Sequence, residues 1–166
     1  MKKGLVGLLG FLLAVIVLPA QEPGRAASDI ELGKGKVSIQ YGTPKLGDRT
    51  LDDMIKPGLA WRMGMNNPTT LETSVALDFG GKKLNAGKYS LFARSDENKN
   101  WTLIVSSGMK SMLDPATVVL ETPLEFKKDD DVEDLLKITL SKSGAGASLL
   151  VAWGTYRLRS SFKAAP

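Results

Sequence analysis

The chain of 166 residues contains no cysteine and no histidine. Ser-His-Asp and Cys-His catalysis, histidine-ligated zinc, redox thiols and iron–sulfur clusters are therefore all excluded. Because no disulfide can form, a hydrophobic core must stabilise the folded state. A lipoprotein anchor is excluded as well, since it is attached to a cysteine. We expect no cofactor.

The chain also lacks a strong charge of either sign. It has 22 Lys plus Arg against 18 Asp plus Glu, and losing Lys2 and Lys3 would leave 20 basic residues and a balance of +2. The basic residues are scattered and are not interleaved with aromatics, so we predict no nucleic-acid partner. The one acidic run, 129–131, follows two lysines and is interpreted as a solvated turn, with a cation site as the alternative.

Only one long apolar run is present, and it lies at the start of the chain. Lys2 and Lys3 precede the apolar residues 5–18, and Pro19-Ala20 ends the run. This is the pattern of a secretory signal peptide cleaved after Ala20, and the run is shorter than the roughly 20 residues that a membrane span needs. We therefore expect a periplasmic or secreted protein without membrane association after cleavage.

Removal of residues 1–20 would leave 146 residues, a size that suits one domain with a sizeable core. Residues 21–34 are rich in Gly, Ala and charge, and we predict a flexible tail there. The single domain is expected to cover residues 35–166.

Apolar and polar residues alternate along most of this domain, as they do in strands with one buried face. The pattern covers residues 37–41 and 71–79, and residues 87–106 are predicted to form a hairpin with a polar loop at 95–100. Further strands are predicted at 117–121, 135–141, 148–153 and 156–162, with a turn at 143–146.

Helix signals are sparse. Thr50 precedes two acidic residues and Lys56-Pro57-Gly58 follows, which predicts one short helical turn between them; a second is expected within 106–114. Eight or nine short strands with one or two helical turns predict a mainly β fold, an antiparallel β-sandwich of the jelly-roll or immunoglobulin-like kind.

Several motifs together resemble a known family. They are Tyr41-Gly42-Thr43-Pro44, Trp61-Arg62-Met63-Gly64, the run 84–92, Trp101-Thr102-Leu103-Ile104-Val105 and Trp153-Gly154-Thr155-Tyr156-Arg157. As a set they are similar to the secreted bacterial family called domain of unknown function 2911 (DUF2911), over nearly the whole chain after residue 20. The resemblance implies an exported, mostly β domain and no established activity.

Candidate binding residues gather around the turn at Asn66-Asn67. If Trp61 and Met63 point inward, Arg62 points outward beside this turn, near the hydroxyl of Thr69. Arg62, Asn66 and Thr69, with Lys88 further along the chain, are our candidate ligand-binding residues for a carboxylate, sulfate or sugar.

A structural interpretation of the same residues is the main alternative. Arg62 would then pair with an acid such as Asp78, while Asn66 and Thr69 would satisfy backbone groups of the turn. Trp101 and Trp153 are predicted core residues, whereas an exposed pair would suggest a platform for stacking sugars.

Two functions remain open at this point. The first is a non-enzymatic binding or interaction module for an unknown small polar ligand or a protein partner. The second is a carbohydrate-active or other carboxylate-dependent hydrolase, which requires two acids in one cleft, one of them with a raised pKa. The sequence assigns no catalytic residue and no metal ligand, and the first function is favoured.

Overall fold

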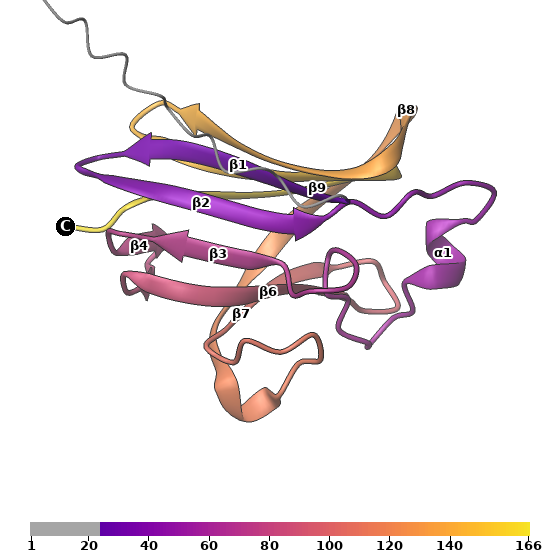
Figure 1. Ribbon diagram of the computed structural model, residues 1–166, viewed down its shortest axis with the longest axis horizontal. Coiled ribbons are helices and arrows are strands. Elements are labelled where there is room, and N and C mark those ends of the chain that lie inside the picture. Colours follow the sequence, from indigo (N-terminus) through magenta and orange to yellow (C-terminus); the bar gives the residue numbers. More distant parts are fainter. Residues whose placement is uncertain (1–23) are drawn as a thin grey trace, which may run out of the picture.

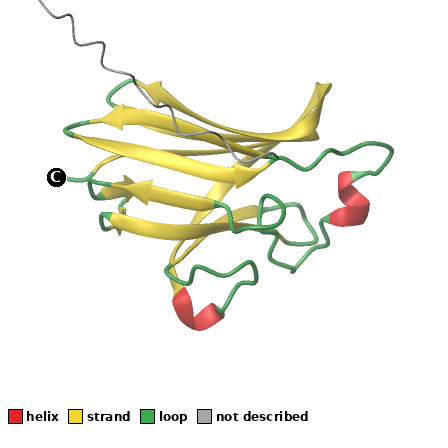
Figure 2. Cartoon of the chain, viewed as in Figure 1, coloured by secondary structure: helices red, strands yellow, loops and turns green. Residues whose placement is uncertain are grey.

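The structure is a computed structural model that describes residues 24–166. The expected signal peptide, residues 1–20, lies outside the described residues. Nine strands dominate the described part of the chain, and the two short helical segments lie at its periphery (Figure 2). The strands are β1 (Arg25–Leu32), β2 (Gly35–Gly42), β3 (Thr70–Thr73), β4 (Leu77–Phe79), β5 (Lys82–Leu84), β6 (Gly87–Ser95), β7 (Trp101–Ser106), β8 (Val118–Ser143) and β9 (Gly146–Ala164).

All nine strands pair antiparallel in one sheet, in the order β1-β2-β3-β6-β7-β8-β9-β4-β5. The predicted mainly β class with eight or nine antiparallel strands is confirmed. The structure adds that the strands form one continuous hydrogen-bonded sheet. Within residues 24–166, no helix has the length and apolar composition needed to span a membrane.

The sheet curls back on itself because β8 and β9 are long and bent, at 26 and 19 residues. The first part of β8 pairs with β7, and its last part pairs with β9 and lies against β1 and β2 (Figure 1). Register shifts on either side of Glu133 bend the β8–β9 pair between these parts. The backbone amide of Leu140 donates to Ser28 Oγ at 2.9 Å and links β8 to β1.

The curled sheet encloses one cluster of buried apolar side chains. Val37 and Ile39 from β2 and Ile138 from β8 are each at most 1 % exposed, as the alternation of apolar and polar residues predicts. Trp101 and Trp153 are also buried, so their prediction as core residues is confirmed. Replacing one of the buried leucines by alanine would remove packing that typically contributes about 2–5 kcal/mol.

The predicted hairpin over residues 87–106 is confirmed as β6 and β7, which pair from Ser90–Ser106 to Ser95–Trp101. Asp96 closes its loop by accepting from the backbone amides of Asn98 and Asn100 at 2.9 and 2.8 Å. Lys99, in the same loop, has φ +62°, a conformation that few non-glycine residues adopt. Its ammonium group lies 2.8 Å from the carboxylate of Asp52.

Several predicted element boundaries were wrong. Residues 25–32, expected in a flexible tail, form β1, which pairs along its whole length with β2. The predicted strand 71–79 is divided into β3 and β4, because the Thr73 hydroxyl bonds both the N–H and the C=O of Val75 and turns the chain. Conversely, the four strands predicted after residue 116 form only two, β8 and β9. Bulges in this pair allow β8 and β9 to stay hydrogen-bonded to each other where the alternation of apolar and polar residues is interrupted.

The first predicted helical turn is confirmed as α1 (Leu51–Met54), with Thr50 as its N-cap: Thr50 Oγ1 accepts from the Asp53 amide at 3.2 Å. The second was misplaced. Residues 107–114 form a loop, and a short 3-10 turn, η1 (Pro115–Thr117), follows it.

Candidate functional site

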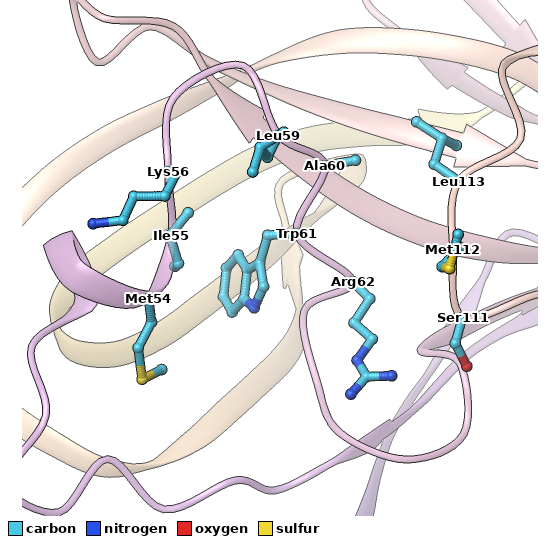
Figure 3. Close-up of a pocket in the computed structure, with 10 residues that line it drawn as sticks. All are labelled: Met54, Ile55, Lys56, Leu59, Ala60, Trp61, Arg62, Ser111, Met112 and Leu113. Atoms are coloured by element: carbon cyan, nitrogen blue, oxygen red, sulfur yellow. The ribbon is translucent and has the colours of Figure 1, made fainter.

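A groove of about 500 Å³ lies between two loops beside the sheet. One wall is the segment that leaves α1, and the other is the loop between β7 and η1 (Figure 3). Seven of its ten lining residues are apolar, two are cationic and none is acidic. We call it the Arg62 groove; its lining residues are Met54, Ile55, Lys56, Leu59, Ala60, Trp61, Arg62, Ser111, Met112 and Leu113.

Trp61 fixes the floor of this groove. Its backbone forms two hydrogen bonds with Ala93 of β6, at 2.7 and 2.8 Å, so the segment runs beside the sheet. The Trp61 indole stacks on Trp153 with ring centroids 5.8 Å apart, and Trp101 meets it edge-on at 6.5 Å. The ring is only partly buried and is held by two buried rings behind it. A rigid aromatic surface therefore faces the groove.

Arg62 enters the groove because its two neighbours are directed toward the core. Met63 is fully buried and Trp61 packs against the core cluster, as the sequence predicts. Arg62 Nη1 reaches the carbonyl of Asn66 at 3.5 Å, which is a long hydrogen bond. Among residues 24–166, no acid forms an ion pair with Arg62.

The structural alternative for Arg62 named Asp78 as its partner. Asp78 instead lies 3.6 Å from Lys163 Nζ and accepts the Gly81 amide at 2.6 Å. Among residues 24–166, the Arg62 guanidinium uses one of its five donors, in the long hydrogen bond to Asn66.

The other predicted site residues occupy different positions. Asn66, at φ +58°, faces solvent, and its carbonyl accepts from Arg62 and from Ser111 Oγ, the latter at 3.1 Å. Thr69 is 1 % exposed and donates to the Met63 carbonyl at 2.8 Å. The structure therefore brings Arg62 and Asn66 together, while Thr69 closes the loop beneath them through a buried hydrogen bond.

Lys88 lies in a second hollow, of about 550 Å³, on the polar face of β2, β3 and β6. Its Nζ is 3.9 Å from Glu72, its direct cross-strand partner on β3. Lys36 in the same hollow is 3.5 Å from Asp29. We call this region the Lys88 hollow; it is lined by Lys36, Ser38, Gln40, Glu72, Thr73, Ser74, Gly87 and Lys88.

A charged cluster that the sequence did not indicate holds α1 in place. Asp52 accepts a short hydrogen bond from the Tyr156 hydroxyl and lies 2.8 Å from Lys99 Nζ and 3.7 Å from Lys128 Nζ. Both lysines also lie over the Tyr156 ring, 5.8 and 5.6 Å from its centroid. These four residues, the Asp52 clamp, come from four distant parts of the chain, so no spacing in the sequence could have revealed them.

Hydrogen bonds from Lys99 and then Tyr156 lower the pKa of Asp52 to about 2. Burial, followed by the hydrogen bond to Asp52, raises the pKa of Tyr156, and the bond to Asp52 raises the pKa of Lys99. At neutral pH the carboxylate and the ammonium are thus charged and the phenol is neutral. None of the three is poised for proton transfer, so the clamp is a positioning device.

Gly154 completes the support of α1. It has φ +52°, and a Cβ at this position would lie 3.1 Å from side-chain atoms of both Leu46 and Leu51. Leu51, the first residue of α1, is buried against this point of β9. The following residues, Met54 and Ile55, form part of the groove wall, so the clamp and Gly154 together determine where that wall lies.

Carboxyl groups are not arranged for acid catalysis in either hollow. The Arg62 groove contains no acid and the Lys88 hollow contains Glu72 alone. Where a carboxyl pKa departs from its usual value, at Asp52, Asp96 and Asp134, hydrogen bonds lower it. Among the described residues, no three acids gather in a way that could hold a metal ion.

The acidic run lies within β8. Asp129 is 3.6 Å from Arg157 Nε, and Arg157 Nη2 donates to the Asp131 carbonyl at 2.7 Å. The run is thus fastened to β9 by an arginine.

The fold and the groove define a class: an antiparallel β protein with a cationic, largely apolar surface groove beside its curled sheet. Residues 23–162 match the family described as "Protein of unknown function (DUF2911)", so the chain belongs to that family, as its motifs suggested. No curated protein and no solved structure matches the chain.

Proposed function

We propose that this protein is an exported, non-enzymatic binding module that holds a small anionic ligand in the Arg62 groove. The observation that carries the proposal is the state of Arg62. It lies beside the partly buried ring of Trp61, has no ion-pair partner in residues 24–166, and shares its groove with no acid. A guanidinium in such a place is suited to bind a carboxylate or a related oxyanion through two parallel hydrogen bonds.

Export is supported by the start of the sequence, where two lysines, the apolar run 5–18 and Pro19-Ala20 have the order of a signal peptide. A chain without cysteine forms no disulfides in an oxidising compartment, so its folded state depends on its hydrophobic core in their place.

A binding role is favoured over hydrolysis for a chemical reason. Without histidine or cysteine, hydrolysis would depend on a pair of carboxyls, one of them protonated near neutral pH. The carboxyls with altered pKa values have lowered ones, and neither hollow brings two acids together. No specific observation favours the hydrolase.

The test is a thermal-shift screen of anions, sugars and metal ions against the purified protein. A ligand that binds only the folded state raises Tm, by an amount that grows with its concentration over Kd. We expect an oxyanion to raise Tm in the parent and not in Arg62→Ala. Arg159→Ala is the matched control, because Arg159 is an exposed arginine of β9 outside the groove.

Two outcomes would overturn the proposal. If Arg62→Ala responds to the same anion as strongly as the parent, the site lies elsewhere. If no compound changes Tm, the proposal of a small anionic ligand fails and a protein partner is favoured.

A further inference from the structure

Exposed apolar side chains surround Arg62. Six large apolar side chains are strongly exposed in residues 24–166, and two of them line the Arg62 groove: Leu59 at 65 % and Met112 at 81 %. A third, Met109, belongs to the same loop as Met112. A small hydrated anion bound to Arg62 would leave these side chains in water. Exposed apolar groups gathered at one groove are typical of a surface that is covered in use.

The groove also has two different ends. Figure 3 shows the Arg62 guanidinium at one end of the ring of lining residues and Leu59 at the other, with the Trp61 ring between them. Ile55 lies on one side and Met112 on the other. The second cation, Lys56, lies beyond Ile55, and its ammonium points away from the Trp61 ring and from Arg62 (Figure 3). A ligand that lies over the Trp61 ring from Arg62 toward Leu59 would therefore meet the guanidinium first and then apolar side chains.

The apolar lining suits a flexible hydrocarbon chain. Met54 and Met112 are unbranched side chains that adapt to irregular shapes, and the fixed Trp61 ring offers a flat surface. A volume of about 500 Å³ lies within the range of small-molecule sites. The cations Arg62 and Lys56, without any acid in the lining, exclude a cationic head group.

We infer that the Arg62 groove binds an amphipathic monocarboxylate, whose carboxylate pairs with Arg62 and whose unbranched hydrocarbon chain lies over Trp61 toward Leu59 and Met112. The inference rests on the proposed function and adds the class of ligand. On this inference, burial of the ligand's apolar surface contributes to its affinity in addition to the charge of its carboxylate. Affinity should therefore rise with chain length, because each added methylene buries more apolar surface.

The test is isothermal titration with four probes that separate head from tail. Decanoate carries both parts, butyrate has the head with a short tail, 1-decanol has the tail with a neutral head, and decyltrimethylammonium has the tail with the opposite charge. We expect decanoate to bind at least tenfold more tightly than any of the other three. Decanoate is used below its micelle concentration, so that aggregates do not contribute.

Three variants assign the two halves of the site. Arg62→Gln keeps a planar polar group and should weaken decanoate at least tenfold, with no effect on 1-decanol. Leu59→Ser, at an exposed position, should reduce the gain from butyrate to decanoate. Arg159→Gln is the control and should bind decanoate as the parent does. Circular dichroism establishes that each variant is folded.

The outcomes separate this inference from the function on which it rests. If butyrate or sulfate binds in an Arg62-dependent way as tightly as decanoate, the ligand class is wrong while the binding module survives. If no anion binds, both fail. Equal binding of decyltrimethylammonium, or unchanged decanoate binding in Arg62→Gln, also overturns the inference. Binding of the protein to anionic phospholipid vesicles without binding of monomeric decanoate would overturn it in favour of a lipid surface.

Discussion

The Arg62 groove and the Lys88 hollow are similar in size, at about 500 and 550 Å³. They differ in whether their charged side chains form ion pairs. In the hollow, Lys88 and Glu72 are direct partners on paired strands, and Lys36 has Asp29. In the groove, Arg62 comes from an irregular segment that meets β6 only at the Trp61–Ala93 bridge, and no acid of residues 24–166 forms an ion pair with it. A regular antiparallel ladder thus places opposite charges face to face, whereas a loop at the edge can present an unpaired one.

The two regions also depend on different supports. The hollow is built on β2, β3 and β6 and needs only their register. The groove wall depends on α1, which the Asp52 clamp and Gly154 hold against β9. Changes at these supports should therefore affect the groove and leave the hollow intact.

The largest effect is expected from Gly154→Ala. The alanine would have to adopt an unfavourable positive φ, and its Cβ would press on the side chains of Leu46 and Leu51. Together these two effects should lower the free energy of unfolding by about 2–4 kcal/mol. Thermal unfolding should show a Tm lower by roughly 5–15 °C. Gly144→Ala is the matched control, because Gly144 has φ +57° with open space around it and carries the backbone cost alone. Equal losses in the two variants would contradict the role of packing at Gly154.

A second prediction gives the groove the acid that it lacks. Met112→Glu places a carboxylate on an 81 % exposed position of the groove wall, where it can pair with Arg62. We expect anion binding to weaken at least tenfold, about 1.4 kcal/mol, with Tm nearly unchanged. Met112→Gln, of the same shape without charge, should retain more of the binding. If the two variants bind an anion equally, the unpaired state of Arg62 is not what attracts ligands.

The third prediction concerns the clamp and its pH dependence. Asp52→Asn should lower the free energy of unfolding at pH 7 by about 1 kcal/mol or less, because the carboxylate is more than half exposed and solvent screens its pairs. The folded-state pKa of about 2 lies below the reference value of 3.8, so the stabilisation by Asp52 is complete above pH 4 and is lost as pH falls toward 2.

Denaturant unfolding measured at several pH values checks this. The parent should lose more stability than Asp52→Asn between pH 4 and pH 2. Parallel pH profiles for the two proteins would mean that the carboxylate of Asp52 has no effective partner in solution.

The smallest effect is expected in the hollow. Glu72→Gln removes the partner of Lys88, but this pair is exposed and 3.9 Å long, so the free energy of unfolding should change by less than about 0.5 kcal/mol. In this variant Lys88 becomes a cation without its Glu72 partner, on a sheet face whose hollow has no large apolar side chain in its lining. Titration with decanoate should detect no new binding. New binding at the hollow would mean that charge alone makes a site in this protein.

Much of the fold could be predicted from the sequence because alternation is a local property. Val37 and Ile39 are spaced for one buried face, and residues 87–106 carry a polar loop between two alternating runs. The direction of Arg62 followed from the same rule, since Met63 beside it is buried. The points at which strands end could not be predicted in the same way. A hydroxyl at Thr73 ends one strand, whereas the bulges near Glu133 continue another, and strand propensity distinguishes neither case.

The candidate site was predictable only in part. Arg62 and Asn66 are close in sequence and remain together in space, whereas Thr69 is buried and Lys88 belongs to the other hollow. The loop containing Met112 and the Asp52 clamp were not found, because their residues meet only when β7, β8 and β9 are paired.

The order and types of the residues alone establish which chemistry is available: no thiol, no imidazole, a β pattern with an apolar core, and an arginine directed outward beside a tryptophan. Which charged side chains have partners depends on the folded structure. Pairing between side chains depends on distances of a few ångströms across strands and loops far apart in the chain, and these distances exist only once the sheet has curled. For that reason Lys88 and Asp52 are paired with their neighbours, while Arg62 has no ion-pair partner within residues 24–166 and lies beside a largely apolar groove.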